Sequence, residues 1–106
     1  MPICITARYR VRPQFAKDCR KIIQDLMDHV KQNEPGTLFY MAQQEILDPM
    51  RFQQTIVFKD EAAMLLHQNS KAADRFVSLL YPNTLEPLEF TEHHLVAFKP
   101  GDPGIP

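Results

Sequence analysis

The sequence of 106 residues has no tryptophan, only two cysteines, and no apolar run near the roughly 20 residues that a membrane-spanning helix requires. Cys4 and Cys19 are too far apart for a CxxC motif, and no second cysteine pair could complete a zinc site. No histidine lies close in sequence to activate either thiol. We therefore expect neither a metal centre nor a cysteine nucleophile.

An excess of charge of one sign is also missing. The formal net charge of −1 gives no electrostatic reason to expect nucleic acid or an acidic membrane as a partner. Arg8, Arg10 and Arg12 alternate along one segment, and we interpret them as a solvated or salt-bridged strand face rather than a phosphate site. The N-terminal segment alternates polar and apolar residues and lacks the apolar stretch of a signal peptide, so we expect a cytoplasmic protein.

The periodicity of apolar residues predicts one domain with seven regular elements. The length and the hydrophobic content of 44% are ordinary for a single globular domain. Alternation predicts strands over 3–12, 37–46, 52–58 and 88–98. Apolar residues at helical spacing predict helices over 15–33, 60–70 and 72–80.

This order of elements predicts an α+β, ferredoxin-like fold, the split βαβ arrangement. Its four-stranded antiparallel sheet would carry helices on one face only. The other face would then present mostly apolar residues, namely Phe39, Met41, Val57, Leu95 and Ala97. Because an open apolar sheet face is normally covered, we predict a homodimer through this face. We assign residues 1–98 to the domain and the Pro/Gly-rich residues 99–106 to a mobile tail or a clasp on a neighbour.

His67 is the candidate functional residue. Ala63 and His67 are four residues apart, with Leu66 beside them, so the imidazole should lie on the apolar side of its helix. An imidazole exchanges protons near neutral pH and could act as a base or as a hydrogen-bond donor in a pocket. The alternative is a packed, hydrogen-bonded core histidine without a catalytic role.

Aromatic residues supply candidates for ligand contacts. Tyr40 could orient a phenolic oxygen. An apolar cavity could be walled by Phe52, Phe58, Phe76 and Phe90, although core packing is the alternative for each ring. His93 and His94 point to opposite faces of a strand, so they cannot share one metal ion. We expect one of them, His94 in our assignment, to line the pocket or the dimer interface.

Four short motifs, in this order along the chain, resemble one known family. They are PGTLFY at 35–40, DPMRF at 48–52, FKDEAA at 58–63 and HQNS at 67–70. The antibiotic biosynthesis monooxygenase domain has the similar pattern PG-x-L-x-Y, D-P-x-x-F, aromatic-x-D-x-x-A and H-x-x-S. The resemblance extends over roughly residues 3 to 98. It implies a dimeric α/β barrel and the oxygenation of quinol or polycyclic phenol substrates without metal or flavin.

Two departures from the family pattern affect the functional expectation. The family often has a glutamate where Ile56 stands, and often a tryptophan where Phe58 stands. A heme-degrading branch uses a tryptophan at the position of His67 and an axial histidine at that of Val77, so we do not expect heme degradation.

Two classes of function therefore stay open. The first is a cofactor-independent monooxygenase that acts on a quinol or polycyclic aromatic compound, with His67 as base or hydrogen-bond donor. The second is a non-catalytic dimeric module that binds a small apolar ligand, with an isomerase of the same superfamily as a further alternative. The histidine of the H-x-x-S motif favours the first class, and Ile56 favours the second.

Overall fold

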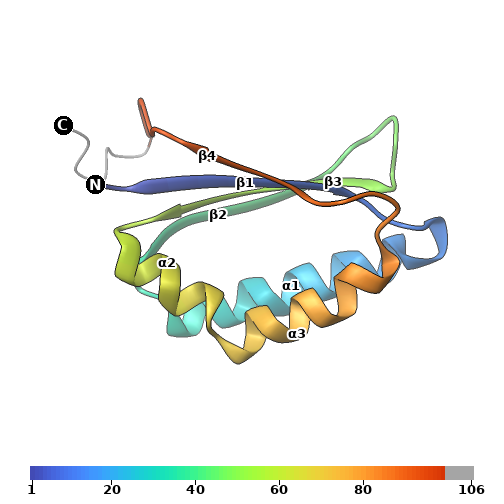
Figure 1. Ribbon diagram of the computed structural model, residues 1–106, viewed down its shortest axis with the longest axis horizontal. Helices are drawn as coiled ribbons and strands as arrows, with labels where there is room; N and C mark the ends of the chain where they lie inside the picture. The colour runs from blue at the N-terminus through green and yellow to red at the C-terminus, as the bar shows by residue number, and fades with distance from the viewer. Residues whose placement is uncertain (100–106) are drawn as a thin grey trace.

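The structure, a computed structural model, describes residues 1–99. Its regular elements are β1 (Ile3–Arg10), α1 (Ala16–Asn33), β2 (Thr37–Gln44), β3 (Arg51–Phe58), α2 (Glu61–Gln68), α3 (Lys71–Leu80) and β4 (Glu89–His93). The strands form one antiparallel sheet in the order β2-β3-β1-β4, and all three helices lie on one of its faces (Figure 1). The predicted ferredoxin-like α+β fold is thus confirmed.

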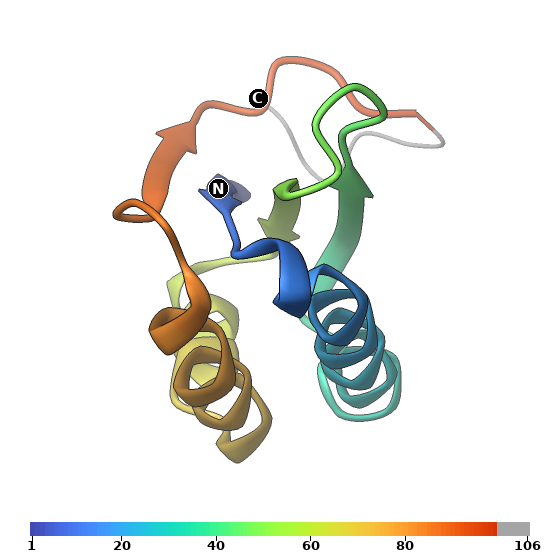
Figure 2. The same cartoon turned by 90° about the vertical axis from the view of Figure 1, so that its right-hand side faces the viewer.

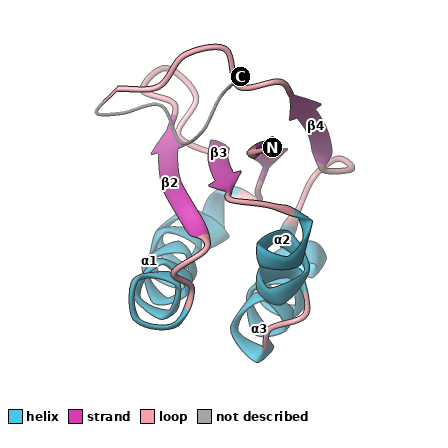
Figure 3. Ribbon diagram, turned by 90° about the vertical axis from the view of Figure 1, so that its left-hand side faces the viewer, coloured by secondary structure: helices cyan, strands magenta, loops and turns pink. Residues whose placement is uncertain are grey.

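The helices form two rows beneath the sheet. Viewed along the helices, α1 runs under the β2 side, whereas α2 and α3 follow one another under the β4 side (Figures 2 and 3). The inward side of α1 is a stripe of buried apolar residues, namely Cys19, Ile22, Ile23, Leu26 and Val30. This stripe buries apolar surface against the sheet, which is the main source of stability for an amphipathic helix.

A capping residue stands at the start of each of α2 and α3. The side chain of Asp60 accepts a hydrogen bond from the Ala63 amide at 2.9 Å, and that of Ser70 accepts one from the Ala73 amide at 3.0 Å. Each cap satisfies an amide that the first turn of a helix leaves unpaired. The Ser70 cap therefore starts a new helix at Lys71 instead of extending α2, and the sequence predicted this helix over 72–80.

Gly36 allows the loop between α1 and β2 to touch α2. A Cβ atom at position 36 would lie 2.6 Å from the Cβ of Ala63, so any side chain there would push the two segments apart. The Gly36 carbonyl also accepts a hydrogen bond from the Lys59 amide at 2.8 Å. This close approach brings the residues just before Gly36 against α2, which matters for the site described below.

The last strand is shorter than the sequence predicted. The prediction extended it to residue 98, but β4 ends at His93, which pairs with Cys4. Because β1 is the only strand beside β4 and begins at Ile3, residues further along have almost no backbone partner. Beyond His93 the chain crosses toward the opposite edge, where the Phe98 ring meets Phe39 of β2 edge-on, with 5.4 Å between centroids.

Leu95 and Ala97 are therefore not strand residues, contrary to the prediction. On the face opposite the helices, Val57 is buried, whereas Met41 remains 41% exposed. The predicted tail lies outside the described residues except for Lys99.

Two of the three alternating arginines make polar contacts with other side chains. Arg10 forms an ion pair with Asp48 at 3.0 Å, and Arg12 donates a hydrogen bond to the Asn83 side chain at 2.8 Å. Within the described part of the chain, no helix is long and apolar enough to cross a membrane.

Candidate functional site

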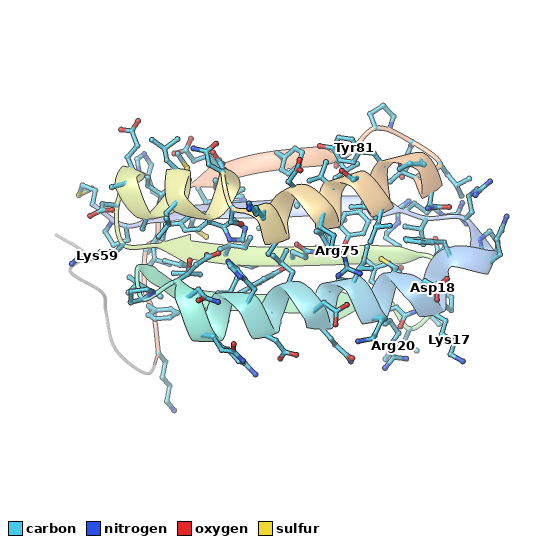
Figure 4. All side chains as sticks on the ribbon, turned by 90° about the horizontal axis from the view of Figure 1, so that it is seen from below. Lys17, Asp18, Arg20, Lys59, Arg75 and Tyr81 are labelled. Atoms are coloured by element: carbon cyan, nitrogen blue, oxygen red, sulfur yellow. The ribbon has the colours of Figure 1, made fainter. Side chains whose placement is uncertain are left out.

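A mostly apolar cavity of about 320 Å³ lies between the sheet and α3. Its walls are formed by Ile5, Ala7 and Tyr9 of β1, Gln54, Ile56 and Phe58 of β3, and Ala73, Phe76, Val77 and Leu80 of α3. Leu88 and Phe90 border it at the β4 edge, where Phe90 is 61% exposed. Tyr81, which also lines the cavity, follows α3 on this same side of the molecule (Figure 4). The volume falls in the range of small-molecule sites.

His67 forms the polar end of this cavity. The residue is buried, and its Nδ1 lies 2.8 Å from Oε1 of Glu34, which is buried as well. Because a carboxylate only accepts hydrogen bonds, this contact places the ring proton on Nδ1 and leaves Nε2 as the basic nitrogen. Nε2 has no hydrogen-bond partner among the described residues and is not among their buried unpaired atoms, so it keeps some accessible surface on a side chain that lines the cavity.

Glu34 itself is held by the turn that Gly36 permits. Its Oε1 accepts a second hydrogen bond, from the Thr37 hydroxyl, at 2.8 Å. Aromatic rings surround the imidazole: Phe58 lies 5.3 Å away and Tyr40 lies 6.3 Å away between centroids. The ring is therefore fixed in position and in tautomer, an arrangement found where a histidine serves as a general base.

Two further polar side chains of the wall, Gln54 and Tyr9, belong to a chain of hydrogen bonds that begins behind the wall at Tyr40. The Tyr40 hydroxyl donates to Oε1 of Gln54 at 3.0 Å, and Nε2 of Gln54 donates to the Tyr9 hydroxyl at 2.6 Å. Burial raises the pKa of both tyrosine hydroxyls, so they stay protonated and cannot serve as bases near neutral pH. Of the side chains lining the cavity, this leaves His67 as the candidate base.

The structure brings some of the predicted site residues together and separates others. His67, Phe58, Phe76 and Phe90 all line the one cavity. Tyr40 lies one layer behind the wall, where it contacts His67 and Gln54 without lining the cavity. The ligand contacts themselves stay predictions for these residues.

Phe52 and His94 lie away from the cavity. Phe52 is 2% exposed and stacks on Tyr9, with 5.9 Å between ring centroids, within the core beneath α1. His94 is exposed and follows the end of β4. Along β3, Phe52 near its start belongs to the core cluster, whereas Gln54, Ile56 and Phe58 further along the strand line the cavity. Neither Phe52 nor His94 therefore contacts the space around His67.

Sequence reasoning missed Glu34, Gln54 and Tyr9. Gln54 had a detectable signal, since it is a polar residue in the inward phase of β3, between Phe52 and Ile56. Glu34 directly precedes Pro35-Gly36, but only the folded chain brings it to His67, 33 residues away. Among residues 1–99, no group of three His, Cys, Asp or Glu side chains could hold a metal ion.

The fold and the cavity define a small α+β domain of the ferredoxin-like class, with a mostly apolar pocket between sheet and helices. Residues 2–79 match the sequence profile of the family Antibiotic biosynthesis monooxygenase. The chain therefore belongs to the antibiotic biosynthesis monooxygenase family. No curated protein shows significant similarity to it.

Solved structures agree on the fold. One antibiotic biosynthesis monooxygenase is 19% identical with a TM-score of 0.81, over 90% of this chain and 99% of that one. A Caulobacter crescentus protein assigned to the same activity is 21% identical with a TM-score of 0.83, over 91% of each chain. A Nitrosomonas europaea protein, also so assigned, is 14% identical with a TM-score of 0.84, over 95% of this chain and 94% of that one. At these identities the likeness shows the fold alone.

Proposed function

We propose that this protein is a cofactor-independent monooxygenase that oxidises a quinol or polycyclic aromatic compound in the His67 cavity. The observation that carries the proposal is the buried His67–Glu34 pair, with the His67 side chain in the lining of an apolar space of about 320 Å³. Family membership supports the reaction class. The apolar walls suit a flat ring system, because aromatic faces pack favourably on apolar and aromatic side chains.

An anthrone illustrates the reaction that this geometry could perform. His67 Nε2 removes a proton from the activated CH₂ group, and the apolar walls exclude water from the anion. The anion gives one electron to dioxygen, and the resulting radical pair forms a C–O bond. The peroxide anion takes the first proton back from His67 and becomes a hydroperoxide. His67 then removes the remaining C–H proton as the O–O bond breaks. One oxygen atom remains as the new carbonyl, and the other leaves as hydroxide, which takes up that second proton and becomes water.

The position of Glu34 favours an enzyme over a passive binding module. Where the family often has a glutamate, Ile56 lines the cavity, but Glu34 supplies a carboxylate directly behind His67. Burying a carboxylate costs free energy, which a site that only encloses an apolar ligand would not need. Such buried pairs of titratable groups concentrate at functional sites.

The proposal is tested by oxygen uptake with menadiol and with anthrone as substrates. We expect the wild-type protein to consume oxygen faster than the uncatalysed reaction with at least one of them, because the pocket supplies both a base and a dry environment. Uptake at the uncatalysed rate with both compounds would instead favour the non-catalytic binding module. A change of the substrate without oxygen consumption would indicate the isomerase.

We also propose a homodimer through the sheet face opposite the helices. This face has no helical cover, and Met41 in its edge strand is 41% exposed (Figure 3). Light scattering should give twice the monomer mass at micromolar concentration, and Met41→Lys should weaken the assembly by placing a charge in the contact. Lys31→Met, a change on the helical side, is the control. A wild-type monomer at that concentration would contradict the proposal.

A further inference from the structure

His29 approaches the Glu34 carboxylate at the oxygen atom that His67 leaves unpaired. Nδ1 of His67 and the Thr37 hydroxyl each lie 2.8 Å from Oε1 of Glu34. Nε2 of His29 lies 3.4 Å from the other oxygen, Oε2. Among the described residues, Oε2 is the one buried side-chain oxygen or nitrogen atom without a hydrogen-bond partner. An N–H group beside such an oxygen offsets part of the free energy that burying its charge costs.

The tautomer of His29 is set by Asn33, one turn later on α1. The Asn33 amide nitrogen lies 3.1 Å from the His29 carbonyl oxygen and 3.3 Å from Nδ1 of the His29 ring. The carbonyl oxygen only accepts hydrogen bonds, so the Asn33 nitrogen is the donor in both contacts. Nδ1 of His29 therefore accepts, and the neutral ring carries its proton on Nε2, beside Oε2 of Glu34. At 3.4 Å this contact is slightly longer than an ordinary hydrogen bond and acts as an attraction between the N–H group and the carboxylate charge.

Glu34 is enclosed although it borders the surface. Its side chain is 2% exposed, while that of His29 is 29% exposed. Both residues border a surface hollow between α1 and α2, together with the apolar side chains of Leu65 and Leu66. Because Oε2 is closed to water, the N–H group of His29 stands where water would stand at an exposed carboxylate.

The charge of Glu34 decides what His67 can do. An ionised carboxylate only accepts hydrogen bonds, so it keeps the His67 ring proton on Nδ1 and leaves Nε2 basic. A protonated carboxyl group can instead donate to Nδ1, which moves the ring proton to Nε2 and leaves no basic nitrogen for the substrate. We propose that His29 is a positioning residue, whose Nε2–H group keeps Glu34 ionised and thereby holds His67 in the basic tautomer. The purpose of this arrangement rests on the proposed function, whereas the tautomer itself does not.

Two hydroxyl groups near the carboxylate are engaged elsewhere. The Tyr40 hydroxyl donates to Gln54 at 3.0 Å, and burial, followed by the charge of the carboxylate, raises its pKa so that it keeps its proton. The Ser70 hydroxyl borders the surface hollow but donates to the His67 carbonyl oxygen at 2.8 Å. Neither hydroxyl therefore serves Oε2, and the role falls to His29.

The first test compares anthrone oxidation by two variants of His29. Leucine fills a similar space and keeps water from Oε2 but has no N–H group, whereas glutamine carries an amide N–H at nearly the same distance from the backbone as the imidazole Nε2–H. We expect kcat to fall by about tenfold in His29→Leu, because part of the protein then holds His67 in the wrong tautomer. KM should change little, since His29 does not line the cavity. His29→Gln should behave like the wild type.

Controls of folding make the comparison specific. Circular dichroism and urea unfolding should show that both variants stay folded, and His29→Met supplies a second apolar replacement. A wild-type kcat in the folded apolar variants would overturn the inference. An equal loss of kcat in His29→Leu and His29→Gln would also overturn it, because the effect would then come from the shape of the ring and not from its N–H group.

The second test needs no substrate and so separates this inference from the proposed function. The ring ¹⁵N chemical shifts of His67 in solution NMR show which nitrogen carries the proton. We expect the proton on Nδ1 in the wild type and in His29→Gln, and a large fraction on Nε2 in His29→Leu. An unchanged tautomer in His29→Leu would overturn the inference even if the wild type oxidises anthrone. A changed tautomer in a protein that oxidises nothing would uphold the inference and refute the proposed function.

Discussion

Replacing His67 by glutamine is expected to lower kcat for anthrone oxidation by about 10²- to 10⁴-fold, the usual contribution of a general base. Glutamine has a similar length and can still donate a hydrogen bond to Glu34, so the buried carboxylate keeps a partner. It cannot, however, accept a proton from the substrate. Because the apolar walls of the cavity are unchanged, KM should change little. Steady-state oxygen uptake measures both constants.

Two controls make this result specific. His94→Gln removes an exposed imidazole outside the cavity and should leave kcat unchanged. Circular dichroism and urea unfolding should show that His67→Gln retains the fold. If folded His67→Gln oxidised anthrone as fast as the wild type, the histidine would be a packed core residue. The reaction would then need another base.

Replacing Phe52 by alanine is expected to lower the free energy of unfolding by about 3–5 kcal/mol, the range for loss of a buried aromatic ring. Phe52 is 2% exposed and packs on Tyr9 in the core beneath α1, so its removal leaves a void. Urea unfolding followed by circular dichroism measures the change. The midpoint should fall while the slope stays constant, as for a pure loss of stability.

Phe76→Ala is the matched comparison for Phe52→Ala. Phe76 lines the cavity, so its truncation should raise KM for anthrone by removing a wall that contacts the ring system. Phe52→Ala should leave KM unchanged in the protein that remains folded, because Phe52 does not line that cavity. A raised KM without loss of stability in Phe52→Ala would return Phe52 to the ligand-binding set predicted from the sequence.

The contrast between Phe52 and Phe58 shows what the alternation of apolar residues can and cannot predict about a strand. Alternation correctly put both rings on the inward face of β3. It could not tell that Phe52 lies in the core beneath α1 while Phe58 lies beside His67. That difference depends on which side chains of other elements lie over each end of β3, which is a property of the assembled fold. The same limit applies to β4, whose end depends on where β1 begins.

Only part of the candidate site could be predicted from the sequence. Helical spacing correctly predicted that His67 turns inward, since spacing is a local property of one helix. Its partner Glu34 comes from a different element and is brought near only because Gly36 lets the preceding loop pack against Ala63. Contacts that join distant elements leave no periodic signal in a single sequence.

The most direct measurement is a crystal structure of the protein grown without oxygen in the presence of anthrone. The account predicts the tricyclic ring system between the sheet and α3, with its reacting carbon or its oxygen next to Nε2 of His67. A ligand bound only elsewhere, with the imidazole enclosed by side chains and the cavity collapsed, would contradict it.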